Sequence, residues 1–576
     1  MQDMDSRKNK SSFPVTDEDV KGVVFDRQGN AYSHDWTRLL ATLDNRKVTV
    51  DSQCRIICDG AFCDMKSLET VVLPSGLEAI GADAFRNCYS LTRIRIPGGV
   101  KVIGAGAFQG SSLEKITLPD AVTRLEDKLF EGCMELKKVE IPDGVLYVGA
   151  ETFSDCFSLR GIRLPESVRE MGDRCFCGCE SLREVEMPSS ELHLGNEVFS
   201  GCPKLTEFRS PFATPTGRAL VLDGRLCAFA SFGISSYTVP GDVFSIGPGA
   251  FSDCLLLERL TLPASVKEID PKAINGCYSL TRIESPFSTP DGRCVILGGE
   301  LCAFAGEGLA MYSLPDTVKK IGENVFYSCS SLRGVTLPDD LEEIGSGAFA
   351  LCHSLEGISF PPSLRCIGAS AFNFCVALQE VVLPDGMTEV APDTFADCDA
   401  LLRVVLPDGV TRIGYGAFSK CVTLPSVRIP ARVNEIGKEA FSGCESLADV
   451  EFIPNPEKGR DRPLKIGEKA FAECSAIARM MLPEDTAEIG PLAFASCRQL
   501  EEMTVPAAVT VLGSGAFRAC TALKRVMLCG RETRIEPWAF YQCESLSEIR
   551  VPEGTGAFYR EQLPPEQQDL VREMAG

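Results

Sequence analysis

Histidine is scarce in this 576-residue sequence, which contains only His34, His193 and His353. Ser/His/Asp and Cys/His catalytic arrangements need side chains within hydrogen-bond reach, and these three histidines lie far apart along the chain. A phosphate-binding P-loop and a dinucleotide-binding glycine motif are also absent from the sequence. We therefore predict a protein that is not an enzyme and that needs no cofactor.

Positive charge is also in short supply. The chain has 58 Lys and Arg against 80 Asp and Glu, a formal net charge of −22 at pH 7. Phosphate contacts require a basic footprint, so the composition argues against a nucleic-acid partner. It favours cationic or mixed-charge partners instead.

Long apolar runs are missing as well. No stretch of about 18 apolar residues occurs, which excludes a recognisable membrane-spanning helix. The first ten residues lack the apolar core of a signal peptide. Taken as written, the sequence predicts a protein that stays in the cytoplasm.

What the sequence has in abundance is a repeat of 23 residues, marked by a phenylalanine and a cysteine three residues later. Self-similarity at a period of about 20–50 residues is typical of a solenoid, because one repeat cannot bury its own apolar face and must stack on its neighbours. Ile274 occupies one phenylalanine position. The phenylalanines are Phe62, Phe85, Phe108, Phe130, Phe153, Phe176, Phe199, Phe251, Phe326, Phe349, Phe372, Phe395, Phe418, Phe441, Phe471, Phe494, Phe517 and Phe540.

Residues 76–97 illustrate one repeat, with the consensus V-x-x-I-G-x-x-A-F-x-x-C-x-S-L-x-x-V-x-L-P. In the V-x-L segment, Ile94 and Ile96 alternate with Arg93 and Arg95, which predicts a short half-buried strand. We expect the copies of this strand to form one parallel sheet. The A-F-x-x-C segment predicts a short helical turn that directs Phe and Cys inward. The predicted fold is therefore an α/β, mostly β, solenoid.

The consensus recurs almost intact at residues 344–361 and 413–430 and extends over roughly residues 52–552. In these residues the chain resembles the leucine-rich repeat superfamily, and within it the BspA-like class found on bacterial and some protozoan surfaces. The asparagine of ordinary leucine-rich repeats is absent. The resemblance implies a right-handed superhelix that binds proteins, including adhesion to a host or neighbouring-cell protein. It also implies export, so a cytoplasmic and a cell-surface location both remain open.

Two insertions interrupt the period and are copies of each other, at residues 210–230 and 285–305. Asp223-Gly224 and Gly298-Gly299 stand between apolar runs in them, a strong hairpin signal. We therefore expect hairpin-bearing coils at about residues 210–240 and 285–315.

The ends of the chain differ from its repeats. Within a solenoid domain predicted over residues 22–552, residues 22–50 resemble a degenerate third hairpin coil that caps the first repeat. Residues 1–21 are polar and predicted to be disordered, and residues 553–576 to form a C-terminal cap. A polar surface loop is expected at residues 455–463.

Of the 27 cysteines, 17 occupy the position three residues after the phenylalanine. We call these the ladder cysteines and expect them to be buried, reduced thiols, because a row of equivalent neighbours specifies no disulfide pairs. Cys175, Cys177 and Cys179, like Cys54 and Cys58, have no histidine nearby and match no usual zinc spacing. No metal site is predicted. The ladder cysteines are Cys88, Cys133, Cys156, Cys179, Cys202, Cys254, Cys277, Cys329, Cys352, Cys375, Cys398, Cys421, Cys444, Cys474, Cys497, Cys520 and Cys543.

The outward positions of the V-x-L strands are the predicted binding surface of a non-catalytic protein, either adhesin-like or a scaffold. In the N-terminal coils a basic stripe is expected to change to an acidic one, whereas Val382, Val405, Met481 and Met527 place apolar side chains outward further along. Alternatives left open are carbohydrate binding, a parallel β-helix carbohydrate enzyme that uses the three glutamates, and an inert spacer. The stripe consists of Arg93, Arg95, Lys115, Lys138, Arg163, Glu184, Glu186 and Glu207.

Overall fold

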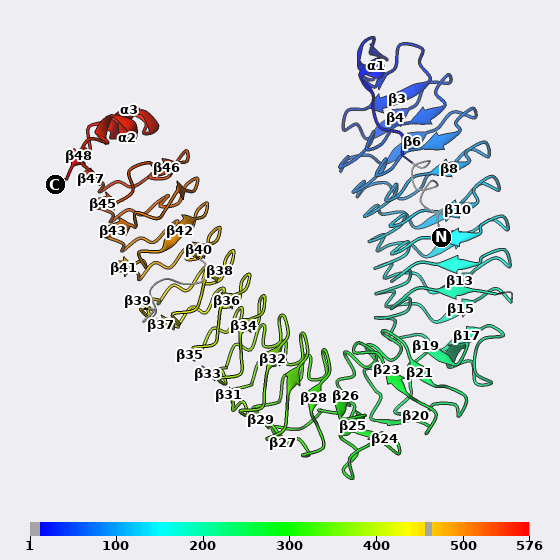
Figure 1. Cartoon of the computed structure of the whole chain (residues 1–576). Helices are drawn as coiled ribbons and strands as arrows, with labels where there is room; N and C mark the ends of the chain where they lie inside the picture. The colour runs from blue at the N-terminus through cyan, green and yellow to red at the C-terminus, as the bar shows by residue number, and fades with distance from the viewer. Residues whose placement is uncertain (1–11, 190, 455–462, 575–576) are drawn as a thin grey trace. The chain divides into compact units, whose positions relative to one another are not determined.

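The computed structural model describes residues 12–189, 191–454 and 463–574. The chain forms two compact units, which meet in sequence at Pro286 and Phe287. We call them the N-terminal and the C-terminal unit. Each is a stack of coils, nearly all of them built from short strands and turns (Figure 1). The predicted solenoid, mostly β with parallel strands, is confirmed.

One side of each stack carries the V-x-L strands, whose central residue is buried while its neighbours face outward in most coils. In the N-terminal unit these are β4 (Lys47–Thr49), β6 (Thr70–Val72), β9 (Lys115–Thr117), β11 (Lys138–Glu140), β13 (Gly161–Arg163), β15 (Glu184–Glu186), β17 (Glu207–Arg209), β20 (Ser236–Thr238), β22 (Arg259–Thr261) and β24 (Arg282–Glu284). In the C-terminal unit they are β27 (Met311–Ser313), β29 (Gly334–Thr336), β31 (Gly357–Ile358), β33 (Glu380–Val382), β35 (Arg403–Val405), β37 (Ser426–Ile429), β39 (Asp449–Phe452), β41 (Arg479–Met481), β43 (Glu502–Val505), β45 (Arg525–Leu528) and β47 (Glu548–Val551), followed by the terminal β48 (Val571–Glu573).

The expectation of one continuous sheet on this side is wrong. The V-x-L strands form separate parallel sheets of two to five strands, such as β4–β6, β13–β15–β17 and β41–β43–β45–β47–β48. Between β6 and β9 the segment with Arg93 and Arg95 is not part of a strand. Each strand has only a few residues before a proline removes the next donor, so a small offset between coils breaks the ladder.

A second strand, which the sequence did not predict, precedes the glycine of the I-G motif. Most copies have two residues, too few for a period to show. In the N-terminal unit these I-G strands are β5 (Ile56–Ile57), β7 (Ala79–Ile80), β8 (Val102–Ile103), β10 (Arg124–Leu125), β12 (Tyr147–Val148), β14 (Glu170–Met171), β16 (His193–Leu194), β21 (Ser245–Ile246) and β23 (Glu268–Ile269). In the C-terminal unit they are β28 (Lys320–Ile321), β30 (Glu343–Ile344), β32 (Cys366–Ile367), β34 (Glu389–Val390), β36 (Arg412–Ile413), β38 (Glu435–Ile436), β40 (Leu464–Ile466), β42 (Thr486–Ile489), β44 (Val511–Leu512) and β46 (Arg534–Ile535).

The glycine that follows most I-G strands allows coils to approach closely. A Cβ atom on Gly149, for example, would lie 2.5 Å from the backbone nitrogen of Asp127 in the preceding coil. A side chain has no room there. The close approach between coils therefore explains this glycine.

The predicted helical turn at A-F-x-x-C is wrong. Around Phe85, the residues Asp83 and Asn87 have left-handed φ angles of 53° and 58°, which a right-handed helix excludes. These angles turn alternate N–H groups toward the next coil: Asp83 and Phe85 donate to the carbonyl oxygens of Ala105 and Ala107 at 2.9 and 2.7 Å. The third side of the coil is thus another ladder between coils. In the described residues, helices occur only near the two ends of the chain: α1 (Asp17–Val20), α2 (Gly556–Gln562) and α3 (Pro565–Gln568).

The core of each unit is a column of phenylalanine rings. From Phe62 to Phe199 successive centroids are 4.6–5.7 Å apart, and from Phe326 to Phe540 they are 4.6–5.9 Å apart. Neighbouring rings within these columns are inclined by at most 16°. The 23-residue period is therefore the spacing of a stacked aromatic core.

The two predicted hairpins are confirmed. β18 (Ala219–Leu222) pairs antiparallel with β19 (Arg225–Phe229), and β25 (Cys294–Leu297) with β26 (Glu300–Phe304). The second strand of each hairpin then continues in parallel into the I-G series, with β21 and β28 respectively. Near the N-terminus, β1 (Val24–Phe25), β2 (Ala31–Tyr32) and β3 (Arg38–Ala41) are also antiparallel, and β3 pairs in parallel with β5.

The described part of the predicted disordered tail is ordered. Thr16 and Asp19 form a capping box at the start of α1, and Asp19 pairs with Arg38 of the first coil at 3.1 Å. This buried ion pair holds residues 12–21 against the repeats. Residues 1–11, and residues 455–462 of the expected polar loop, lie outside the described residues. At the other end, the buried Tyr559 of α2 donates a hydrogen bond to the carbonyl oxygen of Gly530 at 2.6 Å.

Candidate binding face

The eight predicted binding residues lie on one side of the N-terminal unit, at the outward positions of consecutive coils. The register places Lys115 of β9 opposite Lys138 of β11, and Glu184 of β15 opposite Glu207 of β17. All eight are exposed except Glu207, which is half-buried. The expected change from basic to acidic side chains is therefore present in their order.

The acidic half of this stripe is neutralised by arginines. Arg209 of β17 pairs with both Glu184 and Glu207, at 2.7 and 2.9 Å, and Arg163 of β13 pairs with Glu186 at 3.4 Å. The predicted stripe did not include Arg209, and a repeat pattern does not show which side chains of neighbouring coils come within ion-pair distance. The three glutamates are thus ion-paired groups rather than a cluster of free carboxylates.

The basic half is different. Lys138 pairs with Glu140 at 2.7 Å, but Arg93, Arg95 and Lys115 have no ion-pair partner among the residues the structure describes. We call these three residues the basic cluster. Val72 of β6, in the coil before Arg93, is 47% exposed. The cluster is a site of positive charge without ion pairs, next to an apolar side chain, on a chain that is acidic overall, although Lys115 lies near the Glu140 carboxylate.

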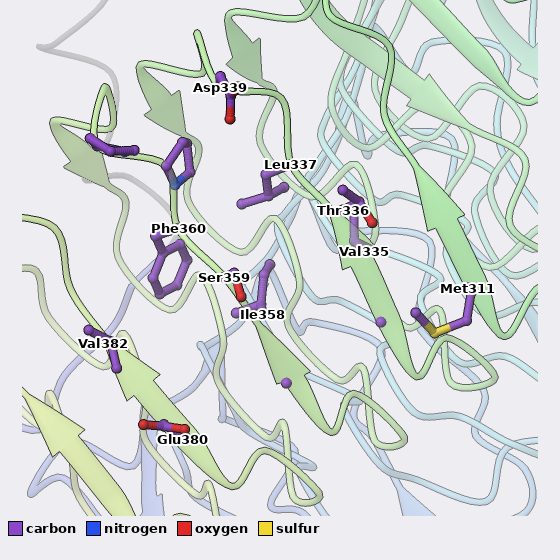
Figure 2. A pocket seen from close by; sticks show the side chains of 14 residues that line it. Met311, Val335, Thr336, Leu337, Asp339, Ile358, Ser359, Phe360, Glu380 and Val382 are labelled. Carbon is purple, nitrogen blue, oxygen red and sulfur yellow. The ribbon is translucent and has the colours of Figure 1, made fainter.

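The C-terminal unit carries a hollow on its V-x-L side. Gly334 of β29 and Gly357 of β31 occupy outward positions where most coils have a side chain. The hollow has a volume of about 740 Å³ and extends from Met311 of β27 to Val382 of β33, as Figure 2 shows with Ile358 and Ser359 between them. We call it the glycine hollow. The signal in the sequence was a glycine before the central V-x-L residue in two consecutive repeats.

The glycine hollow has an exposed apolar side chain on each side, polar groups that include Ser359 and Glu380, and open backbone in part of its floor. Met311 and Val382 are 63% and 44% exposed. The Met311 side chain lies over Gly334, where an added Cβ would be 2.8 Å from its Cε, whereas a Cβ on Gly357 would meet nothing within 4 Å. Phe360 replaces the usual leucine and packs edge-on against Phe372 in the core, with centroids 5.7 Å apart.

Of the other apolar residues predicted to face outward, Met481 is exposed and Val405 and Met527 are half-buried.

Fourteen of the 17 ladder cysteines are buried in the core, whereas Cys277, Cys329 and Cys543 are half-buried. In fifteen of them the thiol donates to the carbonyl oxygen of the phenylalanine in the preceding coil, at 2.9–3.3 Å. Cys254 and Cys329 follow hairpin coils, which offer no such carbonyl. Burial raises the pKa of Cys88 and Cys133 to about 12. These thiols are packing groups and not nucleophiles.

Cys54, Cys58, Cys175 and Cys179 are buried, and Cys177 is half-buried. Within residues 12–189, 191–454 and 463–574, no group of three or more His, Cys, Asp or Glu could hold a metal ion. The same residues contain no helix with the length and apolar character needed to cross a membrane.

The family described as BspA type Leucine rich repeat region matches the sequence in six copies, at residues 41–133, 101–215, 226–290, 300–424, 388–462 and 459–562. The chain belongs to the BspA-type leucine-rich repeat family. Repeat solenoids of this kind present an extended surface that is consistent with protein binding.

Three solved structures illustrate what this BspA-type chain resembles. A leucine rich cell surface protein from Faecalibacterium prausnitzii is 22% identical over 75% of this chain and 93% of its own, with a TM-score of 0.34. A T. pallidum Leucine Rich Repeat protein is 32% identical over 33% of this chain and 86% of its own, with a TM-score of 0.29. A leucine-rich repeat protein from Bacteroides ovatus is 22% identical over 93% and 98%, with a TM-score of 0.27. No curated protein sequence matches the chain.

Proposed function

We propose that this chain is a non-catalytic binding protein whose basic cluster contacts an acidic surface of a partner protein. The observation that carries the proposal is the lack of ion-pair partners for Arg93, Arg95 and Lys115 within the described residues, on a side of the solenoid where most other charges are paired. Because no carboxylate pairs with these three side chains, their positive charge is available to attract an acidic partner surface. Complementary charge of this kind accelerates association and makes it dependent on salt.

A carbohydrate-cleaving enzyme is a weaker alternative. Such enzymes need a pair of carboxyl groups free to act as acid and as base or nucleophile. Here Arg209 engages Glu184 and Glu207, while Arg163 engages Glu186. This pairing supports a binding role for the V-x-L side, not a catalytic one.

The proposal includes a cell-surface, adhesin-like role, because the Faecalibacterium prausnitzii protein with a related sequence is described as a cell surface protein. A cytoplasmic scaffold is the competing location. Protease treatment of intact cells distinguishes the two, since only a surface protein is cleaved without lysis.

The binding proposal is tested by crosslinking and pull-down from the native setting, followed by association kinetics with the captured protein. We expect the charge-reversal variant R93E/R95E/K115E to associate at least about tenfold more slowly at low salt, with its melting temperature nearly unchanged because the three side chains are exposed.

The matched control is the variant R259E/R479E/R572E, which reverses the charge at three exposed arginines in outward positions elsewhere on the chain. This variant should associate normally. Normal binding by the first variant would refute the basic cluster as the binding site. Failure to capture any protein would favour the inert spacer.

A further inference from the structure

We propose that the glycine hollow is a second docking site, which takes a bulky apolar side chain of an extended peptide segment flanked by lysine or arginine. This inference goes beyond the function proposed above, because it concerns the other unit of the chain and a partner segment of the opposite charge.

The shape of the hollow suits an extended segment. It crosses the coils from β27 to β33, which is about 14 Å at the spacing of stacked strands and corresponds to about four extended residues. Its volume of about 740 Å³ is larger than one side chain and lies within the usual range of binding sites, about 300–1,000 Å³. The open space above Gly357, between Met311 and Val382, is where an anchor side chain would bury apolar area on both sides.

Negative charge beside the hollow favours lysine or arginine in the peptide residues that flank the apolar anchor. An exposed aspartate follows the proline in four of five successive coils, and Pro362 takes its place in the third. The four are Asp316, Asp339, Asp385 and Asp408. Asp339 lines the hollow itself. None of the four carboxylates has an ion-pair partner in the described part of the chain.

The cations near this edge are already engaged. Arg365 donates to the carbonyl oxygen of Pro362 at 2.8 Å, and Arg333 and Arg403 pair with Glu356 and Glu380. Arg365 keeps its positive charge, because a carbonyl oxygen is neutral, but the four aspartates outnumber it. The rim therefore carries a net negative charge, and a cationic segment complements it. Among the lining side chains, Met311 and Val382 offer a thioether and a branched aliphatic group on opposite sides of the hollow. These favour an apolar anchor over the flat aromatic platform typical of sugar sites.

The probe is a fluorescein-labelled peptide, Gly-Lys-Thr-Phe-Thr-Lys-Gly, compared with the same peptide carrying Glu in place of Lys. Fluorescence anisotropy with the full chain at low salt should show saturable binding of the lysine peptide. We expect binding of the glutamate peptide to be at least about tenfold weaker, and binding of the lysine peptide to weaken as salt is added.

The variant Gly357→Leu should reduce lysine-peptide affinity at least about tenfold by filling the hollow. It is sterically tolerated, since nothing lies within 4 Å of an added Cβ. Gly161→Leu, the same change at the outward position of β13 in the other unit, is the matched control and should bind normally. The variant D316N/D339N/D385N should weaken binding and flatten its salt dependence.

Equal binding by Gly357→Leu, or equal binding of the two peptides, would overturn the proposal. Tighter binding of a neutral oligosaccharide such as cellohexaose, lost in Gly357→Leu, would replace the peptide with a glycan. The R93E/R95E/K115E variant should bind the lysine peptide normally, so failure of the basic cluster and failure of the glycine hollow give different results.

Discussion

At the scale of single residues, the ladder cysteine combines two properties. It is small enough to fit between stacked coils, and its weak S–H group donates to a phenylalanine carbonyl that already accepts an N–H from a cysteine in its own coil. The Phe130 carbonyl, for example, accepts the N–H of Cys133 and the thiol of Cys156. Alanine would leave the second acceptor site empty, and a larger residue would not fit. This contact gives a physical reason for cysteine in particular at that position.

Thiol titration should separate buried from exposed cysteines. In native protein at pH 8 we expect the ladder thiols to be unreactive toward a disulfide reagent, while Cys366, which is exposed, reacts. Denaturant should release the remaining thiols. Disulfides between most ladder positions, or rapid reaction without unfolding, would contradict the reduced, packed ladder.

The raised thiol pKa values also predict sensitivity to alkali. Burial keeps Cys88, Cys133 and Cys543 protonated in the folded chain to about pH 12, whereas their ordinary value is 9.0. The unfolded chain therefore loses protons first as pH rises. We expect full stability below about pH 9 and a progressive fall in the urea midpoint from there toward pH 12. A midpoint that stays constant up to pH 11 would argue against this linkage.

At the scale of elements, the turn side depends on left-handed residues two positions before and after the phenylalanine. Glycine occupies many of these positions, including Gly106 and Gly110, but Leu351 and Ala519 adopt the same conformation, with φ of 61° and 60°. A left-handed residue with a Cβ costs about 1–2 kcal/mol. The fold accepts this cost because the conformation directs N–H groups to the next coil.

Replacing Ala519 with glycine should therefore stabilise the chain by about 0.5–1 kcal/mol, after allowing for the greater freedom of glycine in the unfolded state. Chemical denaturation measures the change. Ala516 lies three residues earlier in the same coil, is buried and is not left-handed. Ala516→Gly should destabilise the chain instead, and equal effects of the two substitutions would refute the argument.

At the scale of the whole molecule, each unit has its own core: one hydrophobic cluster lies within residues 32–230 and another within residues 294–571. Inside each unit a coil contacts its neighbours in the stack. Stability in such a molecule is approximately a sum of local and nearest-neighbour contributions.

Replacing Phe395 with alanine should accordingly cost about 3–5 kcal/mol locally through a cavity. The Phe395 ring stacks between Phe372 and Phe418, with centroids 5.4 and 5.5 Å away. Hydrogen exchange should accelerate mainly between residues 372 and 418. Uniform loosening from end to end would contradict nearest-neighbour coupling.

The sequence by itself determined the stack, the phenylalanine column, the cysteine ladder and the hairpins at Asp223-Gly224 and Gly298-Gly299. A strict period identifies which residues share a position, and burial follows from their chemistry. The tertiary structure alone decided the left-handed turns, the I-G strands and the breaks between sheets, because these depend on backbone angles and hydrogen bonds between coils.

For the candidate sites, too, some features could be predicted from the sequence and others required the structure. The period predicted that Arg93, Arg95 and Lys115 face outward, but only the structure could show that they lack ion-pair partners in the described residues while Arg209 neutralises Glu184. Pairing depends on which side chains from neighbouring coils come within reach. The glycine hollow likewise exists only after the coils stack. Gly334 and Gly357 lack side chains, and the space that this leaves becomes a cavity when their two coils lie side by side.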